Sequence, residues 1–392
     1  MHGRLRSIFT HATAAENGAP LQVEILSHGW PEQVRPEWDA LASDTATPNP
    51  FYESWGVEAG RALPEGGGVR LLLAWRASGE GERLAGVLPI ATQRLRGLAL
   101  ATENWTQRAR ALGDPLLRTG EEAAFWRAAL PALAREPGHY LRLSALDADS
   151  ASTRALQQVL TEQERPFYRT RSYSRAELTG DLSSAEHAAA HVRGKVLKEH
   201  RRLRSRLAER GELCFDRLAP GADPGPWIDD LFRLEISGWK GRDGVAAAAD
   251  PATDRCFRDM LTQAHGRGRL DFHRMRVGDT VLSMLANLEA GDEAFQLKIA
   301  YDEEWASFSP GVLIEMEYLT HALDVRRLRR VDSCARAGHP MIDRIWPARR
   351  EIVSLAIPFD SAASRTLCAG MERVRRGREA RSVNRAEVES AT

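Results

Sequence analysis

The segment between residues 294 and 315 has the pattern of an anion site that follows a strand. A predicted strand at 294–301 leads through one loop into a predicted helix that opens with Ser309, Pro310 and Gly311. Serine caps helices, proline suits the first helical position, and glycine lets a ligand approach the backbone. The free N–H groups and the positive dipole end of such a helix suit a pyrophosphate. A plain N-capped helix is the alternative interpretation.

A second polar cluster lies in the stretch 332–346. His339 and Asp343 are four residues apart, so they share one face if this stretch is helical. Such a pair could hold the imidazole in one tautomer for general-base work on an amine or hydroxyl. The alternative is a structural hydrogen bond that ties down a loop. Glu235 is a further candidate base, with a helix-surface acid as its alternative interpretation.

Several other residues are candidates for an acceptor pocket. Trp239 and Lys240 could line it, or they are a packed tryptophan and a solvated lysine at a helix end. Asp302 could polarise the acceptor or simply end its strand. Cys334 is better interpreted as a small buried hydrophobic residue than as a covalent nucleophile, because no matching His–Asn set is evident.

Helices that alternate with strands position these residues, which predicts an α/β (α+β) fold. The turns at Gly278-Asp279 and at 291–293 predict an antiparallel three-stranded meander before the Ser-Pro-Gly helix. In the first half we expect strands at 21–26, 69–76, 83–93, 139–146 and 167–178, and helices at 31–41, 121–135 and 152–164. In the second half we expect helices at 185–210, 227–238, 253–265 and 310–323, and strands at 213–218, 269–277, 280–289, 294–301, 327–332 and 351–357.

A length of 392 residues favours two domains, and turn residues near 179–184 mark a boundary. We therefore expect a flexible tail at 1–20, one domain at 21–180, a second domain at 181–360, and a basic, disordered tail at 361–392.

The formal net charge is zero, and 50 of the 54 basic residues are arginines, so no global field for nucleic acid is expected. The four cysteines form no Cys-x-x-Cys pair, which indicates neither a disulfide framework nor a metal site. With no signal peptide or membrane-spanning run evident, a cytoplasmic protein is expected.

The chain resembles the acetyltransferase domain of the CelD/BcsL type, a GNAT branch related to the FemAB peptidyltransferases. The resemblance covers roughly residues 45–357 and rests on five weak motifs in the right order. These are Asn49-Pro50-Phe51, Gly113-Asp114-Pro115-Leu116, the arginine-rich helix end at 203–211, the Trp-Lys-Gly motif within 235–241, and Tyr301-Asp302 followed by Ser309-Pro310-Gly311.

The resemblance implies two tandem GNAT-like domains with mixed sheets flanked by helices, and acyl-CoA, acetyl-CoA foremost, bound in the second domain only. At one place the chain departs from the family: Ile342 and Asp343 stand where a tyrosine and a lysine are expected, whereas Arg344 and Trp346 fit. The acceptor pocket is therefore expected to differ. The residues expected to hold the cofactor are Ile299, Ala300, Tyr301, Ser309, Pro310, Gly311 and Val312, and those expected to contact the acceptor are Trp239, Lys240, Asp302 and Arg344.

The expected reaction is acyl transfer from acyl-CoA to an amine or hydroxyl, by family analogy on an envelope or exopolysaccharide precursor. One alternative is a FemAB-like aminoacyl transferase, and another is a degenerate GNAT pair that binds a ligand or signals. The basic helix at 193–210 could contact a CoA phosphate or be a solvated face. The arginine-rich stretch 373–378 is a candidate site for an anionic partner or a nucleotide messenger.

Overall fold

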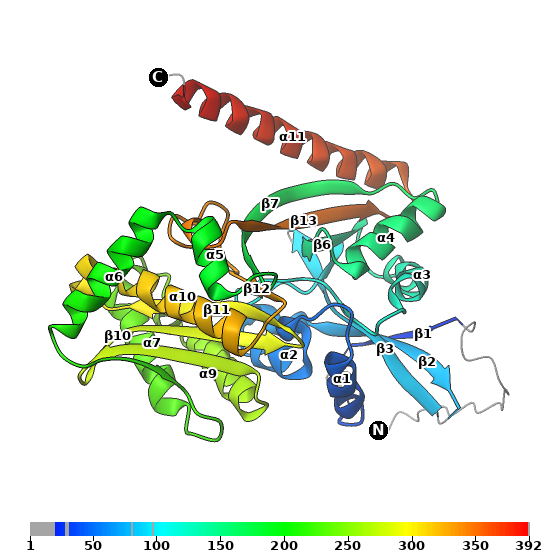
Figure 1. Cartoon of the computed structure of the whole chain (residues 1–392). Coiled ribbons are helices and arrows are strands. Elements are labelled where there is room, and N and C mark those ends of the chain that lie inside the picture. Colours follow the sequence, from blue (N-terminus) through cyan, green and yellow to red (C-terminus); the bar gives the residue numbers. More distant parts are fainter. Residues whose placement is uncertain (1–19, 28–30, 80, 96–97, 391–392) are drawn as a thin grey trace.

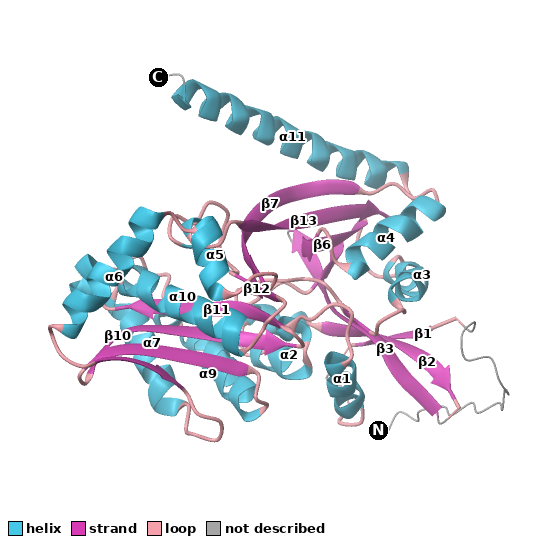
Figure 2. Cartoon of the chain, viewed as in Figure 1, coloured by secondary structure: helices cyan, strands magenta, loops and turns pink. Residues whose placement is uncertain are grey.

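The computed structural model describes residues 20–27, 31–79, 81–95 and 98–390, and their thirteen strands form one mixed sheet (Figures 1 and 2). The predicted flexible tail at 1–20 lies almost entirely outside the described residues. No helix in the described part of the chain is both long and apolar enough to cross a membrane. The strands of the first half are β1 (Gln22–Leu26), β2 (Arg70–Ser78), β3 (Gly81–Leu95), β4 (Leu98–Asn104), β5 (Leu116–Leu117), β6 (Tyr140–Asp147) and β7 (Tyr168–Thr179). Those of the second half are β8 (Leu213–Arg217), β9 (Leu270–Val277), β10 (Thr280–Ala290), β11 (Glu293–Tyr301), β12 (Arg330–Asp332) and β13 (Ala348–Pro358).

Helices cover both faces of this sheet, as the α/β expectation requires (Figure 2). One apolar core packs α1, α3 and α4 against the first half, a second packs α2, α7 and α9 against the middle, and a third packs α6 and α10 against β9, β10 and β11. Apart from the helix expected at 185–210 and the tail, the predicted elements are confirmed to within a few residues. The α-helices are α1 (Val34–Ser43), α2 (Ser54–Gly60), α3 (Glu122–Leu133), α4 (Ala151–Glu162), α5 (Ser184–His191), α6 (Gly194–Ala208), α7 (Gly225–Ser237), α8 (Trp239–Arg242), α9 (Pro251–Gly266), α10 (Pro310–Thr320) and α11 (Ala362–Ser390).

The sheet order shows how the two halves are joined. It runs β1-β2-β3-β4-β6-β13-β7-β12-β11-β10-β9-β8, with β5 beside β3. The last strand, β13, was expected in the second domain but lies between β6 and β7 of the first half. Its Val353, Leu355 and Ile357 are buried in the first-half core, which explains the insertion. The predicted boundary near residue 180 falls in the connection between β7 and α5.

A buried ion network fastens this junction. The guanidinium of Arg350 on β13 contacts Asp332 of β12 at 2.7 Å and Asp147 of β6 at 2.8 Å. Arg175 of β7 contacts the same Asp332 at 2.5 Å. All four side chains are almost fully buried, so removing one partner would leave a buried charge uncompensated. The network therefore fixes the order of the central strands.

Two expected elements differ in the structure. The predicted helix at 185–210 is broken into α5 and α6 because Val192 is extended, with φ −99° and ψ 120°, and turns its side chain into the interior. The tail expected to be disordered forms α11 instead, which lies across β7 and β13 (Figure 1). Cys368 and Met371 pack on the sheet there, and Arg375 donates a 2.8 Å hydrogen bond to the carbonyl of Arg169. Tertiary packing, which the weak sequence pattern did not reveal, stabilises this helix.

The two family-like motifs of the first half contact one another. Asn49 donates from Nδ2 to the carbonyl of Asp114, at 2.7 Å. Gly113 leaves no room for a side chain, because a Cβ there would lie 2.1 Å from the carbonyl oxygen of Ser144. Phe51 packs edge-on against Phe295 of β11, with ring centroids 5.9 Å apart. The motifs therefore brace the strand on which the candidate site is built.

Candidate functional site

The second part of β11 has a free edge. This strand pairs with β10 along nearly its whole length, but within the described chain it pairs with β12 only at Glu293–Phe295. A β-bulge at Leu297 adds one residue to β11 just beyond the point where β12 stops. Backbone groups between Leu297 and Tyr301 therefore face a gap in the sheet, where an extended ligand could pair with them.

A small cleft of about 30 Å³ lies at this edge, which is space for roughly one water molecule. It brings together six of the residues that the sequence analysis singled out, although they come from α7, α8 and β11. The lining residues are Leu234, Glu235, Gly238, Trp239, Lys240, Ile299, Ala300, Tyr301 and Glu303.

Glu235 is a buried anion held by two lysines, not a helix-surface acid. Its Oε1 accepts from Lys298 at 2.7 Å and from Lys240 at 3.3 Å, and its Oε2 accepts from the N–H of Ala247 at 2.9 Å. Burial alone would raise its pKa, but the lysine charges outweigh burial and hold the pKa below its usual value. A stabilised, fully bonded carboxylate is a poor general base, which argues against that role for Glu235.

Lys298 is a component that the sequence analysis missed. Its ammonium lies 4.2 Å from the ring centroid of Phe257, and its pKa is lowered because burial outweighs the attraction of Glu235. Two features of the sequence could have drawn attention to Lys298. It is one of only four lysines in the chain, and it lies on a strand otherwise rich in apolar residues.

Lys240 closes the free edge of β11. Its Nζ donates to the carbonyl oxygen of Ile299 at 3.2 Å, on the side of the strand that faces the gap. The short helix α8 brings it there by folding back tightly on α7: a Cβ on Gly241 would lie 1.8 Å from the carbonyl oxygen of Ile236. The Trp-Lys-Gly motif therefore has a steric basis, and Glu303 fixes its start by accepting from the N–H of Trp239 at 2.6 Å.

The start of α10 differs from the simple capped helix expected. Ser309 is left-handed, with φ +50°, and its side chain makes no cap; its carbonyl accepts from the N–H groups of Val312 and Leu313 instead. Gly311 is buried, and a Cβ there would lie 3.5 Å from both Met341 Sδ and Tyr301 Cδ1. The side chains of Tyr301 and Met341 therefore stand close over the first turn.

Two arginines, one in the last turn of α6 and one just beyond its end, bring positive charge to the same end of α10. The guanidinium carbons of Arg206 and Arg210 lie 5.2 and 6.0 Å from the ring centroid of Phe308, the residue just before Ser309. Within the described structure neither arginine forms a salt bridge, because Glu199 and Glu317 of this region pair with Arg202 and Arg204. Positive side chains and a helix N-terminus together form a site suited to phosphate groups.

His339 and Asp343 lie on the loop after β12, but they do not form the expected side-chain pair. Asp343 faces Arg349 at 3.7 Å, whereas Nδ1 of His339 accepts from the N–H of Ile342 at 3.5 Å. The pKa of His339 is lowered, first by burial and then by the charges of Arg336 and Lys240, with Asp343 acting in the opposite direction. His339 is therefore close enough to Lys240 to feel its charge.

The remaining candidates are Asp302, Arg344 and Cys334. Asp302 caps the 3₁₀ turn at Glu303–Phe308 by accepting from the N–H of Glu304, and Arg344 is exposed. Cys334 is partly buried, and this desolvation raises the pKa of its thiol, which supports the apolar interpretation over a nucleophile.

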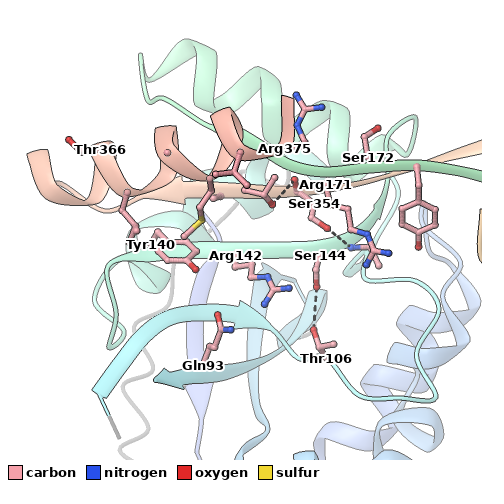
Figure 3. Close-up of a pocket in the computed structure, with 18 of the residues that line it drawn as sticks. Gln93, Thr106, Tyr140, Arg142, Ser144, Arg171, Ser172, Ser354, Thr366 and Arg375 are labelled. Atoms are coloured by element: carbon pink, nitrogen blue, oxygen red, sulfur yellow. Dashed lines mark hydrogen bonds between the residues drawn. The ribbon is translucent and has the colours of Figure 1, made fainter. Parts of the chain in front are cut away.

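A much larger hollow lies elsewhere, in the first half (Figure 3). It is a polar groove of about 1260 Å³ between the sheet and α11, on the face that also carries α7 and α9. Arg110 donates to the hydroxyls of Tyr52 and Ser144, and Arg171 lies 4.8 Å from the ring centroid of Tyr173; neither arginine has an acidic partner among the described residues. The sequence analysis did not find this groove, because its residues come from separate strands and from the tail.

Residues 194–339, from the start of α6 to the loop after β12, match the family model described as "Acetyltransferase (GNAT) domain". The fold of this half is that of a GNAT domain. No curated protein matches the chain. The matched residues include Glu235 with its two lysines, Lys240 and Lys298, which we call the Glu235 cluster. They also include the free edge of β11, the start of α10 and His339.

Solved structures share this fold across most of the chain at low identity. FemX is 10% identical over 86% of this chain and 97% of its own, with a TM-score of 0.54. The C-terminal domain of an assigned lysylphosphatidylglycerol synthetase from Agrobacterium fabrum is 12% identical over 87% of this chain and 95% of its own, with a TM-score of 0.52. A conserved protein of unknown function from Bacteroides thetaiotaomicron VPI-5482 is 12% identical over 82% of this chain and 97% of its own, also with a TM-score of 0.52.

Proposed function

We propose that the protein is an acyltransferase that moves an acyl group from acyl-CoA to an amine or a hydroxyl. The observation that carries this proposal is the free edge of β11, which leads directly to the start of α10 inside the GNAT domain. A free strand edge suits the amide groups of a pantetheine arm, and a helix start flanked by arginines suits the phosphates. The five family-like motifs support the proposal that this acyltransferase is of the CelD/BcsL type.

In the proposed complex the thioester lies at the end of β11. The acceptor atom attacks the thioester carbonyl carbon, the C–S bond breaks, and CoA leaves as a thiol after it takes up a proton. Backbone N–H groups near Ala300 and Tyr301 would stabilise the oxyanion, and His339 would accept the acceptor's proton. The present cleft is too small for the arm, so Lys240 must release Ile299 first.

The groove of the first half is the proposed acceptor site. Arg110 and Arg171 supply positive charge, and Ser144, Ser172 and Ser354 supply hydroxyls; Arg142 also lines the groove but pairs with Glu103. These groups suit an acceptor with an anionic group and several hydroxyls, which is compatible with a precursor of an envelope or exopolysaccharide. The first half then serves as one wall of the acceptor cleft and does not hold the CoA.

Calorimetry with acetyl-CoA tests the donor site. In the double variant Arg206→Glu, Arg210→Glu, we expect affinity to fall by at least tenfold, because two charge-assisted contacts with phosphate become repulsive. The matched control is Arg202→Glu on the same helix, where the wild-type arginine is exposed and already bound to Glu199. Equal affinities for wild type and the double variant would show that the phosphates lie elsewhere.

A second candidate function is aminoacyl transfer, favoured by the similarity to FemX and to the assigned lysylphosphatidylglycerol synthetase. A thermal-shift comparison separates the two. Stabilisation by acetyl-CoA supports the acyltransferase, whereas stabilisation by an aminoacyl-tRNA alone supports the second candidate. Stabilisation by cyclic dinucleotides alone would favour a ligand-binding or signalling role.

A further inference from the structure

A buried polar cluster lies between α10 and the sheet, on the opposite face from the Glu235 cluster. Fifteen buried side-chain atoms among the described residues have no hydrogen-bond partner, and six of them gather here. They are Asp271 Oδ2, His273 Nε2, both side-chain polar atoms of Asn287, Glu315 Oε1 and the hydroxyl of Tyr318. Buried polar atoms are normally paired, so this concentration points to a bound polar species.

Three of the side chains at one end of this cluster converge. Asp271 and His273 are two residues apart on β9, so both project from the same face of the strand. His321 is the first residue of a π-helical turn, His321–Val325, which continues α10. π-Helical turns inside helices often occur at functional sites, because the extra residue redirects a side chain.

The ligand atoms of these three side chains lie close enough together to share one ion. His273 Nε2 lies 2.9 Å from Asp271 Oδ2, yet neither atom has a hydrogen bond with adequate geometry. His321 Nε2 lies 3.4 Å from the same Oδ2, and the three ligand atoms all lie within 4.8 Å of one another. Ligands bound to one Zn²⁺ at about 2.0–2.2 Å in tetrahedral geometry are separated by roughly 3.3 Å.

We propose that Asp271, His273 and His321 bind a divalent first-row transition metal ion, with Zn²⁺ as the type. Two imidazole nitrogens and one carboxylate oxygen are a ligand set that such ions favour. The hydroxyl of Tyr318, fully buried and without a partner, stands at the same cluster, and its ring lies 5.3 Å from that of His273. This metal site would be a property additional to the proposed acyl transfer. It runs against the expectation, based on the cysteines, that the chain has no metal site.

The charges around the site fit this assignment. Arg217 Nη1 lies 3.2 Å from His321 Nε2 and would have to move aside for an ion; it is exposed and free to turn into solvent. The carboxylate of Asp271 would offset half of the ion's charge.

The proposed ion would fasten the far end of α10 to β9. The start of α10 is the proposed phosphate site, so the ion would act on the stability and position of this helix and not on the reacting atoms. Its binding can therefore be measured in the absence of acyl-CoA.

The test uses metal-free, tag-free protein titrated with Zn²⁺ by calorimetry and with Co²⁺ by visible absorption. We expect one equivalent of Zn²⁺ per chain, Co²⁺ bands of a low-coordinate site, and a Zn²⁺-dependent rise in melting temperature. Asp271→Asn and His321→Ala should each weaken binding at least a hundredfold. The control is His265→Ala, which removes a partly exposed histidine bonded to the carbonyl of Ala222.

Circular dichroism checks that each variant is folded. If one variant fails to fold, the Zn²⁺ affinity of the other variant tests the proposal. If both fail to fold, the Zn²⁺ stoichiometry and the Co²⁺ spectrum of the wild-type protein test it. Wild-type protein that takes up less than a tenth of an equivalent, or Asp271→Asn and His321→Ala variants that bind Zn²⁺ like the control, would overturn the proposal. Unchanged acetyl-CoA affinity in metal-free protein would leave the metal site and the donor site independent.

Discussion

Lys240 Nζ donates a hydrogen bond to the carbonyl oxygen of Ile299, 3.2 Å away, and so occupies the strand edge that the proposed acyl donor would use. The same ammonium is 3.3 Å from Glu235, which has a shorter contact of 2.7 Å with Lys298. Lys240 can therefore leave the edge while Glu235 remains paired with Lys298. We therefore expect Lys240 to act as a gate, which moves away from the strand edge when the acyl donor binds, and Lys298 to remain as the counter-ion of Glu235.

Lys240→Met should raise acyl-CoA affinity. Removing one competing hydrogen bond of about 1 kcal/mol corresponds to roughly a fivefold gain, measured by calorimetry with acetyl-CoA. Lys298→Met is the contrasting variant: it removes the nearest charge from buried Glu235 and should destabilise the protein by about 3–5 kcal/mol. A loss of affinity in Lys240→Met, with an unchanged melting temperature, would contradict the gate and make Lys240 a binding residue.

Gly241→Ala should disturb the cleft through the backbone. The added Cβ would meet the carbonyl oxygen of Ile236 at 1.8 Å, so α8 must move away from α7 and take Lys240 with it. We expect a loss of several kcal/mol in the free energy of unfolding, measured by urea denaturation. Gly194→Ala is the control, because a Cβ there meets nothing within 4 Å. Equal stability of the two variants would refute the steric account of the Trp-Lys-Gly motif.

Glu315 should make stability depend on pH. Burial raises the pKa of its carboxyl from 4.5 to about 7. Between these values the folded protein holds a proton that the unfolded chain has released, so the free energy of unfolding falls as the pH rises towards 7. From pH 5 to pH 8 the loss should be about 2–3 kcal/mol.

Glu315→Gln removes this titration. Urea denaturation at pH 5 and pH 8, with EDTA present, should show a smaller loss of stability with pH in the variant than in the wild type. Glu317→Gln on the same helix is the control, because the wild-type Glu317 is half-exposed and pairs with Arg204. Parallel pH profiles for wild type and Glu315→Gln would count against a buried, protonated Glu315.

His339→Ala should lower turnover by about two to four orders of magnitude once an acceptor is found, with little change in melting temperature. Asp343→Asn should have a much smaller effect, because Asp343 pairs with Arg349 at 3.7 Å and acts on His339 only through its charge, with no side-chain hydrogen bond between the two. The measurement is a steady-state rate with acetyl-CoA, alongside a melting curve for each variant. Full activity of His339→Ala with a lowered melting temperature would identify His339 as a loop tether and redirect the search for a base to Asp302.

The sequence alone determined the parts that depend on local patterns. Alternating apolar residues and turn signals located the meander β9–β10–β11, and the Ser-Pro-Gly start located α10, because these features involve residues close together in the chain. It also nominated six residues that now line one cleft.

Only the tertiary structure decided what these residues contact. Glu235 could be a base or a surface acid until the fold placed Lys298 beside it, and Asp343 could pair with His339 until the fold paired it with Arg349 instead. The insertion of β13 between β6 and β7, the packing of α11 and the cluster at Asp271 all depend on residues far apart in sequence. Such contacts follow from burial and packing across the whole sheet, which no local pattern encodes.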